Sequence, residues 1–256
     1  MSYLTLSLTL LFVLIPFLLS KTLRLGLEKD ITIATVRSII QLLIIGYVLQ
    51  LIFKADSYIY IGLMVIFMII VATLNARKKG KGIKGITWKI ALTLVVVEVV
   101  TQGILLGLKI VPATPQYIIP ISGMMIGNAM VISVLFLNRF KAELEANEDQ
   151  IELILSLGGT PKQAVHKHLI DSIKASMIPT IEAQKTIGLV QLPGMMSGQI
   201  IGGANPVVAV QFQILIIFAL LTCATLSSVI LGFLVYPTLF NERMQRIEWS
   251  QKEYIK

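Results

Sequence analysis

Long uninterrupted apolar stretches recur along this chain, and they restrict its possible folds more than any other feature. A helix needs about 20 mainly apolar residues to cross a bilayer, and only helices or closed barrels can cross lipid. The stretches are continuous rather than alternating, which favours helices over a barrel. We predict an all-α polytopic membrane protein, a single domain over residues 1–256, with about seven transmembrane helices: residues 3–20, 31–53, 58–74, 88–108, 117–137, 182–201 and 207–236.

The composition agrees with this fold and excludes other classes of protein. Hydrophobic residues make up 55% of the chain and charged residues only 14%, against about 25% charged residues in soluble domains. An ordinary soluble domain, a disulfide-rich secreted module and a disordered chain are therefore excluded. Cys223 lies in an apolar stretch and is predicted to be a packing residue. The first apolar stretch lacks the basic start and small-residue end of a signal peptide, so we expect a retained helix.

The Lys and Arg residues between the stretches predict how the chain lies in the membrane. Residues 75–89 contain six of them, whereas the flanking loops 54–57 and 109–116 contain one each. Because Lys and Arg concentrate in cytoplasmic loops, we predict residues 75–89 to be cytoplasmic, the N-terminus outside and the C-terminus inside. The net charge of +8 follows from the same bias. Membrane lipid is the expected partner of this charge, and nucleic acid is not.

The sixth stretch, residues 182–201, is the least regular of the seven. It contains several polar residues and Pro193. A broken or re-entrant segment is therefore an alternative to a complete span, and such a segment is tolerated only where protein shields it or it lines a cavity.

Residues 138–180 are predicted to form a cytoplasmic insert of two helices. The first helix runs from about residue 141 to residue 157, and Gly158-Gly159 ends it because glycine suits the left-handed position after a helix. Thr160, Pro161 and Gln163 have the pattern of a capping box that opens the second helix. Pro179 marks the expected next break. The apolar face of the second helix consists of Ala164, Val165, His168, Leu169 and Ile173. This helix pair could dock a cytoplasmic partner, or it could be a surface element without one.

A local resemblance favours the partner. The segment from Glu152 to Thr160 resembles the EAA loop of ABC-transporter permeases, with the same spacing from Glu152 to Gly158, although Leu153 and Ile154 replace its two alanines. In that family the loop fits a groove of the ATP-hydrolysing subunit. The resemblance implies coupling roles for Glu152, Leu157, Gly158, Gly159, Thr160 and Pro161.

A wider resemblance covers most of the chain. Its motifs are residues 35–42 (TVRSIIQL), 120–130 (PISGMMIGNAM), 157–161 (LGGTP) and 192–206 (LPGMMSGQIIGGANP). They are similar to FetB-type permeases, the iron-export ABC transporter family that also includes the plant aluminium-tolerance permeases. The resemblance implies a homodimeric permease of the bacterial inner membrane that works with a separate ATPase. ATP and Mg²⁺ would be bound by that partner, and no cofactor is expected on this chain.

Polar side chains within the stretches are candidates for the substrate path, because they are costly in lipid. Glu98 lies in the middle of its stretch, with Gln102 one turn later. We predict a cation or proton site there, and a carboxylate that only bonds neighbouring helices is the alternative. Arg37 and Gln41 could pair with Glu98 or with a headgroup, or Arg37 could extend to the interface. The remaining candidates are Asn128 and Glu182, of which Glu182 could instead pair with Lys185 on its own helix.

Glycines and methionines at recurring positions form a second group. Gly123, Gly127, Gly194, Gly198 and Gly202 recur four residues apart and are predicted to let helices approach closely, including at a dimer contact. The pairs Met124-Met125 and Met195-Met196 could offer soft sulfur ligands to a metal together with Glu98, but packing is the favoured interpretation.

The sequence lacks a Walker A pattern, so ATP hydrolysis is expected in another polypeptide and this chain is not expected to be an enzyme. His166 and His168 are two residues apart and are predicted to be surface residues rather than a metal pair. We therefore expect an ABC permease exporting iron or a related metal. The alternatives are an ion-gradient-driven carrier, with Glu98 as its proton-coupled group, and a membrane scaffold or sensor that transports nothing.

Overall fold

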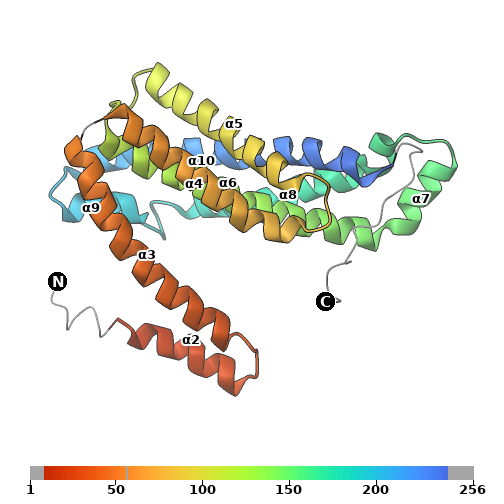
Figure 1. Ribbon diagram of the computed structural model, residues 1–256, viewed down its shortest axis with the longest axis horizontal. Coiled ribbons are helices and arrows are strands. Elements are labelled where there is room, and N and C mark those ends of the chain that lie inside the picture. Colours follow the sequence, from red (N-terminus) through yellow and green to blue (C-terminus); the bar gives the residue numbers. More distant parts are fainter. Residues whose placement is uncertain (1–8, 56, 242–256) are drawn as a thin grey trace. The chain divides into compact units, whose positions relative to one another are not determined.

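The computed structural model describes residues 9–55 and 57–241. Within these ranges it has nine α-helices and two 3-10 helices (Figure 1). The predicted all-α class is confirmed there, since the β-type pairing is limited to one isolated bridge between Ile187 and Gln191. The α-helices are α2 (Leu11–Thr22), α3 (Glu28–Ala55), α4 (Tyr58–Ala76), α5 (Ile86–Gly107), α6 (Pro115–Ala146), α7 (Glu148–Ser156), α8 (Pro161–Thr186), α9 (Gly194–Ile201) and α10 (Pro206–Val235), and the 3-10 helices are η1 (Arg77–Gly80) and η2 (Tyr236–Leu239).

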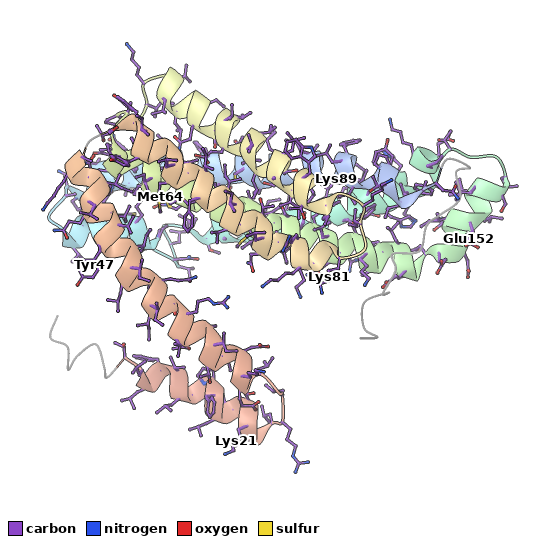
Figure 2. All side chains as sticks on the ribbon, in the orientation of Figure 1. Lys21, Tyr47, Met64, Lys81, Lys89 and Glu152 are labelled. Atoms are coloured by element: carbon purple, nitrogen blue, oxygen red, sulfur yellow. The ribbon has the colours of Figure 1, made fainter. Side chains whose placement is uncertain are left out.

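The chain forms two compact units, Met1–Ser57 and Tyr58–Lys256. The described part of the first unit is a hairpin of α2 and α3. Ser20 of α2 stabilises the turn of this hairpin by bonding the start of α3. Its hydroxyl donates to Glu28 Oε1 at 2.8 Å and accepts from the Leu27 backbone N–H at 3.0 Å. Apolar side chains cover the outside of α3, including the exposed Tyr47 (Figure 2). None of the residues in its most apolar 18-residue window is buried, as suits a helix that faces lipid.

The second unit is a bundle in which α4, α6 and α10 run in one direction and α5 and α8 in the other. Contacts at matching offsets along each pair of helices establish these directions. The parallel contacts are Met68–Gly123 and Asn75–Met130 between α4 and α6, and Tyr117–Phe212 and Phe136–Gly232 between α6 and α10. The antiparallel contacts are Lys89–Thr238 and Glu98–Cys223 between α5 and the α10–η2 segment, and Gln184–Ile217 and Leu169–Gly232 between α8 and α10.

Helix α6 forms the centre of this bundle. It packs against α4, α5, α8 and α10, and its Phe136 and Phe140 are completely buried and stacked with their centroids 5.4 Å apart. The α4–α5 loop and α7 lie toward one end of the bundle, whereas α9 lies at the other end (Figure 1). The basic loop and α7 thus lie away from the Gly-rich segment around α9.

Five segments of the described chain are long and apolar enough to cross a bilayer: Glu28–Ala55, Tyr58–Gly80, Ile86–Gly107, Pro115–Ala146 and Pro206–Leu239. They correspond to five of the seven predicted spans. Of the first predicted span, residues 3–8 lie outside the described residues, and residues 11–20 belong to the shorter helix α2. The count of seven remains a prediction.

The sixth predicted span, residues 182–201, is not one helix. The end of α8, a turn carrying the Ile187–Gln191 bridge and the short helix α9 share these residues, so the broken segment is the correct alternative. The predicted break at Pro179 is wrong, because α8 continues through it to Thr186. A proline removes one helical hydrogen bond, and neighbouring helices can offset that loss in a membrane protein. Here α8 packs against both α6 and α10.

The first helix of the predicted insert also has different bounds. Residues 141–157 are divided at Asn147 between the end of α6 and α7. Asn147 has a non-helical backbone (φ −123°, ψ 29°), and its amide group donates to the Glu143 carbonyl at 2.8 Å. A polar side chain that bonds a carbonyl left free at a helix end stabilises the break.

The predicted turn and capping box are confirmed. Gly158 has a left-handed φ of 84°, the Thr160 hydroxyl accepts from the Gln163 N–H at 3.3 Å, and the Gln163 side chain accepts from the Thr160 N–H at 2.8 Å. The predicted apolar face of α8 is buried throughout, including His168. The prediction of a surface position is therefore correct for His166 and wrong for His168, whose Nδ1 lies 3.7 Å from Glu143 of α6.

Candidate functional site

A group of buried polar side chains lies between α5 and α6. Glu98 occupies the middle of α5 and is only 5% exposed. Next to it, Gln102 of α5 donates to the Ser122 hydroxyl of α6 at 2.8 Å. Both carboxylate oxygens of Glu98 are buried and have no hydrogen-bond partner among the described residues. Gln102 and Ser122 lie close enough to influence the Glu98 carboxylate, although they bond each other rather than its oxygens.

Helix α10 completes this group. Asn128 of α6 donates to the Leu220 carbonyl of α10 at 3.3 Å, and the Cys223 thiol donates to the Met125 carbonyl at 3.0 Å. Cys223 interacts with both Asn128 and Glu98. We call Glu98, Gln102, Ser122, Asn128 and Cys223 the buried polar cluster, of which Asn128 is half-buried.

The chemistry of the buried polar cluster follows from its one carboxylate. A buried and unpaired carboxylate is costly in a membrane interior, so it favours a proton or a cation at Glu98. The neutral neighbours Gln102, Ser122 and Asn128 can contribute oxygen ligands. One carboxylate with neutral oxygens binds a cation weakly, and a site on a transport path must release what it binds.

The remaining predicted path residues are Arg37, Gln41 and Glu182. Arg37 and Gln41 share a face of α3 in the first unit and line a hollow there together with Val36 and Ile40. Glu182 is exposed on α8, and its carboxylate accepts from Lys185 at 2.6 Å, which confirms the alternative of a pair within one helix.

The residues predicted to couple to an ATPase lie together at one end of the second unit. Ile151 is completely buried and fixes α7 on the bundle, whereas Glu152 points outward (Figure 2). Two large apolar side chains are also exposed: Leu153 within α7, and Leu157 directly after it, which is 80% exposed. We call Glu152, Leu153, Leu157 and Gly158 the α7 surface. An acidic group beside exposed leucines is the kind of surface that a protein partner covers.

The glycines differ in what lies next to them. A Cβ on Gly123 would touch Met68 of α4 at 3.7 Å, so Gly123 does lie at a helix–helix contact. At Gly127, Gly194 and Gly198 a Cβ would meet nothing within 4 Å, and at Gly202 only its own helix. Within the described part of one chain, no other helix packs closely against these four glycines.

Three of the four methionines predicted as possible metal ligands belong to the packed interior. Met125 is completely buried, and Met124 and Met195 pack against the core. Met196 is half-buried. Within residues 9–55 and 57–241, no three His, Cys, Asp or Glu side chains gather as metal ligands.

Two kinds of contributor could not be predicted from the sequence. Ser122 and Cys223 are neutral and small, so neither stands out within an apolar stretch. The second is the set that joins α6 to α8: Arg139 pairs with Glu143 at 2.7 Å, and Glu143 faces His168. The spacing of Arg139 and Glu143 is the i, i+4 signal of a helical pair, but the contact with His168 depends on the packing of two helices.

Comparison with known proteins agrees with this architecture. The model of an uncharacterised protein family, UPF0014, matches residues 3–240. The membrane protein YjkA of Bacillus subtilis is 56% identical over 245 residues, which cover 96% of this chain and 98% of that protein. FetB of Escherichia coli K12, a probable iron export permease, is 41% identical over 249 residues, 97% of this chain and 96% of that protein.

The chain is also similar to a plant protein. The membrane protein STAR2 of Oryza sativa subsp. japonica is 37% identical over 227 residues, which cover 89% of this chain and 80% of that protein. No solved structure matches the chain. The family model and these relatives extend over nearly the whole sequence, and the chain therefore belongs to the UPF0014 family of membrane proteins.

Proposed function

We propose that this chain is the membrane-spanning permease subunit of an ABC transporter that exports iron or a related metal species. The observation that carries the proposal is its 41% identity, over nearly its full length, to a protein described as a probable iron export permease. The buried polar cluster supports it with an unpaired carboxylate in the middle of a helix bundle. The energy would come from a separate ATPase that binds ATP and Mg²⁺.

The α7 surface supports the ATPase partner. Its exposed leucines and Glu152 lie on a short helix that Ile151 anchors in the core. Behind it, Arg139, Glu143 and His168 join α6 to α8. A push on α7 would therefore reach α6, the helix that carries Ser122 and Asn128, without crossing a flexible linker.

The proposed transport path runs past Glu98. In an alternating-access cycle, the carboxylate accepts the cation when the cytoplasmic side is open. ATP binding closes the partner ATPases, the α7 surface moves, and the path opens to the outside. Weak oxygen ligands then let the cation leave.

In the cell the subunit would work as a homodimer in the bacterial inner membrane, with its N-terminus outside and C-terminus inside. The opposite directions of neighbouring helices in the second unit fit this orientation.

The decisive experiment is transport by the reconstituted complex. The full chain and its ATPase are placed in proteoliposomes, and Fe²⁺ uptake is measured through molecules whose ATPase faces outward. We expect uptake only with ATP, Mg²⁺ and both proteins. Uptake driven by an ion gradient in the absence of the ATPase would instead identify a secondary carrier.

A matched pair of variants tests the role of Glu98. Glu98→Gln keeps the size of the side chain but removes its charge, so we expect Fe²⁺ transport to fall at least tenfold, which corresponds to about 1.4 kcal/mol. Ser228→Ala is the control, because this buried hydroxyl bonds carbonyls of its own helix and should leave transport unchanged. Wild-type transport by the Glu98→Gln variant would remove Glu98 from the path.

A further inference from the structure

The loop between α4 and α5 has an apolar side and a cationic side. Ile83 and Ile86 are buried and hold the loop on the bundle. Gly80 is buried beneath Ile86, and a Cβ at Gly80 would lie 2.5 Å from the Ile86 side chain. This close contact fixes the loop, because no larger residue fits between η1 and the start of α5. Arg77 and Lys78 are exposed on the other side.

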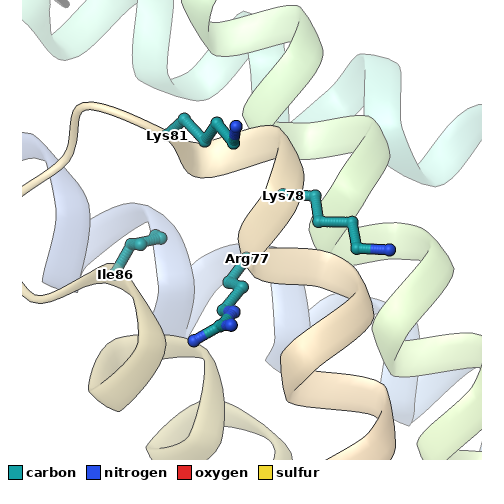
Figure 3. A pocket seen from close by; sticks show the side chains of 4 residues that line it. All are labelled: Arg77, Lys78, Lys81 and Ile86. Atoms are coloured by element: carbon teal, nitrogen blue, oxygen red, sulfur yellow. The ribbon is translucent and has the colours of Figure 1, made fainter. Parts of the chain in front are cut away.

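A pocket of about 630 Å³ opens at this loop, lined by Arg77, Lys78, Lys81 and Ile86. Arg77 extends from η1 toward the side of α5 on which Ile86 lies, whereas the ammonium group of Lys78 points to the opposite side of η1 (Figure 3). On its Arg77 side, the pocket therefore combines a guanidinium group with the apolar wall of Ile86. This combination suits a ligand that has an anionic head and an apolar remainder.

The pocket lies where two apolar helices end. The apolar part of α4 finishes at Ala76, directly before Arg77, and α5 begins at Ile86. Trp88, in the first turn of α5, is 70% exposed. Tryptophan and Lys or Arg side chains gather at the level of lipid headgroups, so this arrangement places the pocket at the membrane interface.

The described residues of α4, η1 and the α4–α5 loop carry no carboxylate that could offset the charge of Arg77 and Lys78. The sequence has no Asp or Glu between Asp56 and Glu98. Of the elements that pack against η1, α6 has its carboxylates at Glu143 and Glu145, which pair with Arg139 and Lys141 on the same helix. None of the ion pairs found within the described residues includes Arg77 or Lys78.

We propose that this pocket binds a phosphate group, and that the headgroup of an anionic phospholipid in the cytoplasmic leaflet supplies it. The guanidinium of Arg77 offers a planar set of donors that suits phosphate oxygens, and Ile86 offers the apolar contact for the lipid. The proposal rests on the cytoplasmic placement of this loop in the proposed topology. It does not depend on what the protein transports.

Trp88 can report the binding directly. In the full-length protein with Trp249→Phe, Trp88 is the only tryptophan in the sequence. Its fluorescence is measured in bilayers that contain brominated phosphatidylglycerol or brominated phosphatidylcholine, since bromine quenches a tryptophan beside it. We expect stronger quenching by the anionic lipid. Each cation near the surface contributes about fivefold to such a preference, so removing two of them in Arg77→Gln/Lys78→Gln should reduce it about 25-fold.

The matched control removes the same charge elsewhere. Lys167→Gln/Lys174→Gln changes two exposed cations of α8 and should keep the lipid preference of the unchanged chain. An equal preference in the Arg77/Lys78 variant and in this control would overturn the proposal. The Fe²⁺ transport assay is run in parallel, so that a failure of the lipid site is distinguished from a failure of the proposed function.

Two further arms distinguish the source of the ligand. In the first, inorganic phosphate is added at constant ionic strength. If phosphate displaces the anionic lipid, the pocket is still a phosphate site, but its ligand is a soluble molecule rather than a lipid. Copurification of the ATPase is measured with the same variants. Weaker copurification together with an unchanged lipid preference would overturn the phosphate proposal and indicate an acidic protein surface as the occupant.

Discussion

At the scale of single residues, Gly232 shows how tightly the second unit is packed. A Cβ at this position would lie 3.0 Å from Leu169 of α8 and 3.2 Å from Phe136 of α6. Gly232→Val should therefore force three helices apart at a cost of about 1–3 kcal/mol. We expect the melting temperature of the detergent-solubilised protein to fall by several degrees, measured by the temperature dependence of its folded fraction.

Gly103 provides the control for this substitution. It lies in α5, also within a long apolar helix, but a Cβ there would meet nothing within 4 Å. Gly103→Val should leave the melting temperature within about one degree of the unchanged protein, because surface substitutions usually change stability by less than about 0.5 kcal/mol. Equal losses in both variants would mean that helix propensity, not packing, determines the effect.

The residues of the candidate site were predictable to different degrees. Glu98 stands out in the sequence because a charge within an apolar stretch is rare, and the structure buries it beside Gln102. Cys223 was predicted only as packing, and its position next to Asn128 and Glu98 depends on how α10 packs. The spacing of His166 and His168 alone predicts two surface residues, but His168 belongs to the apolar face of α8 and is buried against α6.

At the scale of elements, the turn between α7 and α8 has the strictest local requirements. A Cβ on Gly159 would lie 2.8 Å from the backbone carbonyl oxygen of Ile154, and backbone cannot yield as a flexible side chain can. Gly159→Ala should therefore strain the turn by about 1–3 kcal/mol and displace α7 from α8. We expect weaker copurification of the ATPase and at least a fivefold loss of its stimulation by the permease.

Gly158 offers a matched substitution in the same turn. Its left-handed φ of 84° can be adopted by asparagine, and a Cβ there would meet nothing within 4 Å. Gly158→Asn should keep most of the ATPase binding and stimulation. If Gly159→Ala behaved like Gly158→Asn, the geometry of this turn would not matter for coupling.

Some ends of helices can be predicted from residues close in sequence, and others cannot. The Gly-Gly turn and the capping box were predicted correctly because both depend on neighbours in sequence. The break at Asn147 was missed because a side-chain hydrogen bond to Glu143 ends α6 within a continuous helical pattern. The break expected at Pro179 does not occur, since the contacts of α8 with α6 and α10 hold the helix together.

At the scale of the whole molecule, the order of helix directions connects sequence and function. The second unit places the basic α4–α5 loop and α7 toward one end and α9 at the other (Figure 1), as the distribution of Lys and Arg predicts for cytoplasmic and outer segments. The division into two units was not predictable, because the apolar stretches on both sides of residue 57 are alike in composition. An apolar stretch indicates burial in lipid or protein without distinguishing the two.

The predicted orientation can be measured with single cysteines in a Cys223→Ser background, which removes the only native thiol. Lys84→Cys and Ser156→Cys test the predicted cytoplasmic side, and Ala113→Cys and Ala204→Cys test the outside; all four positions are exposed. A membrane-impermeant maleimide applied to intact cells should label only the cysteines at 113 and 204. After permeabilisation, all four should react. Labelling at 84 in intact cells would invert the topology, and with it the proposed access of the α7 surface to a cytoplasmic ATPase.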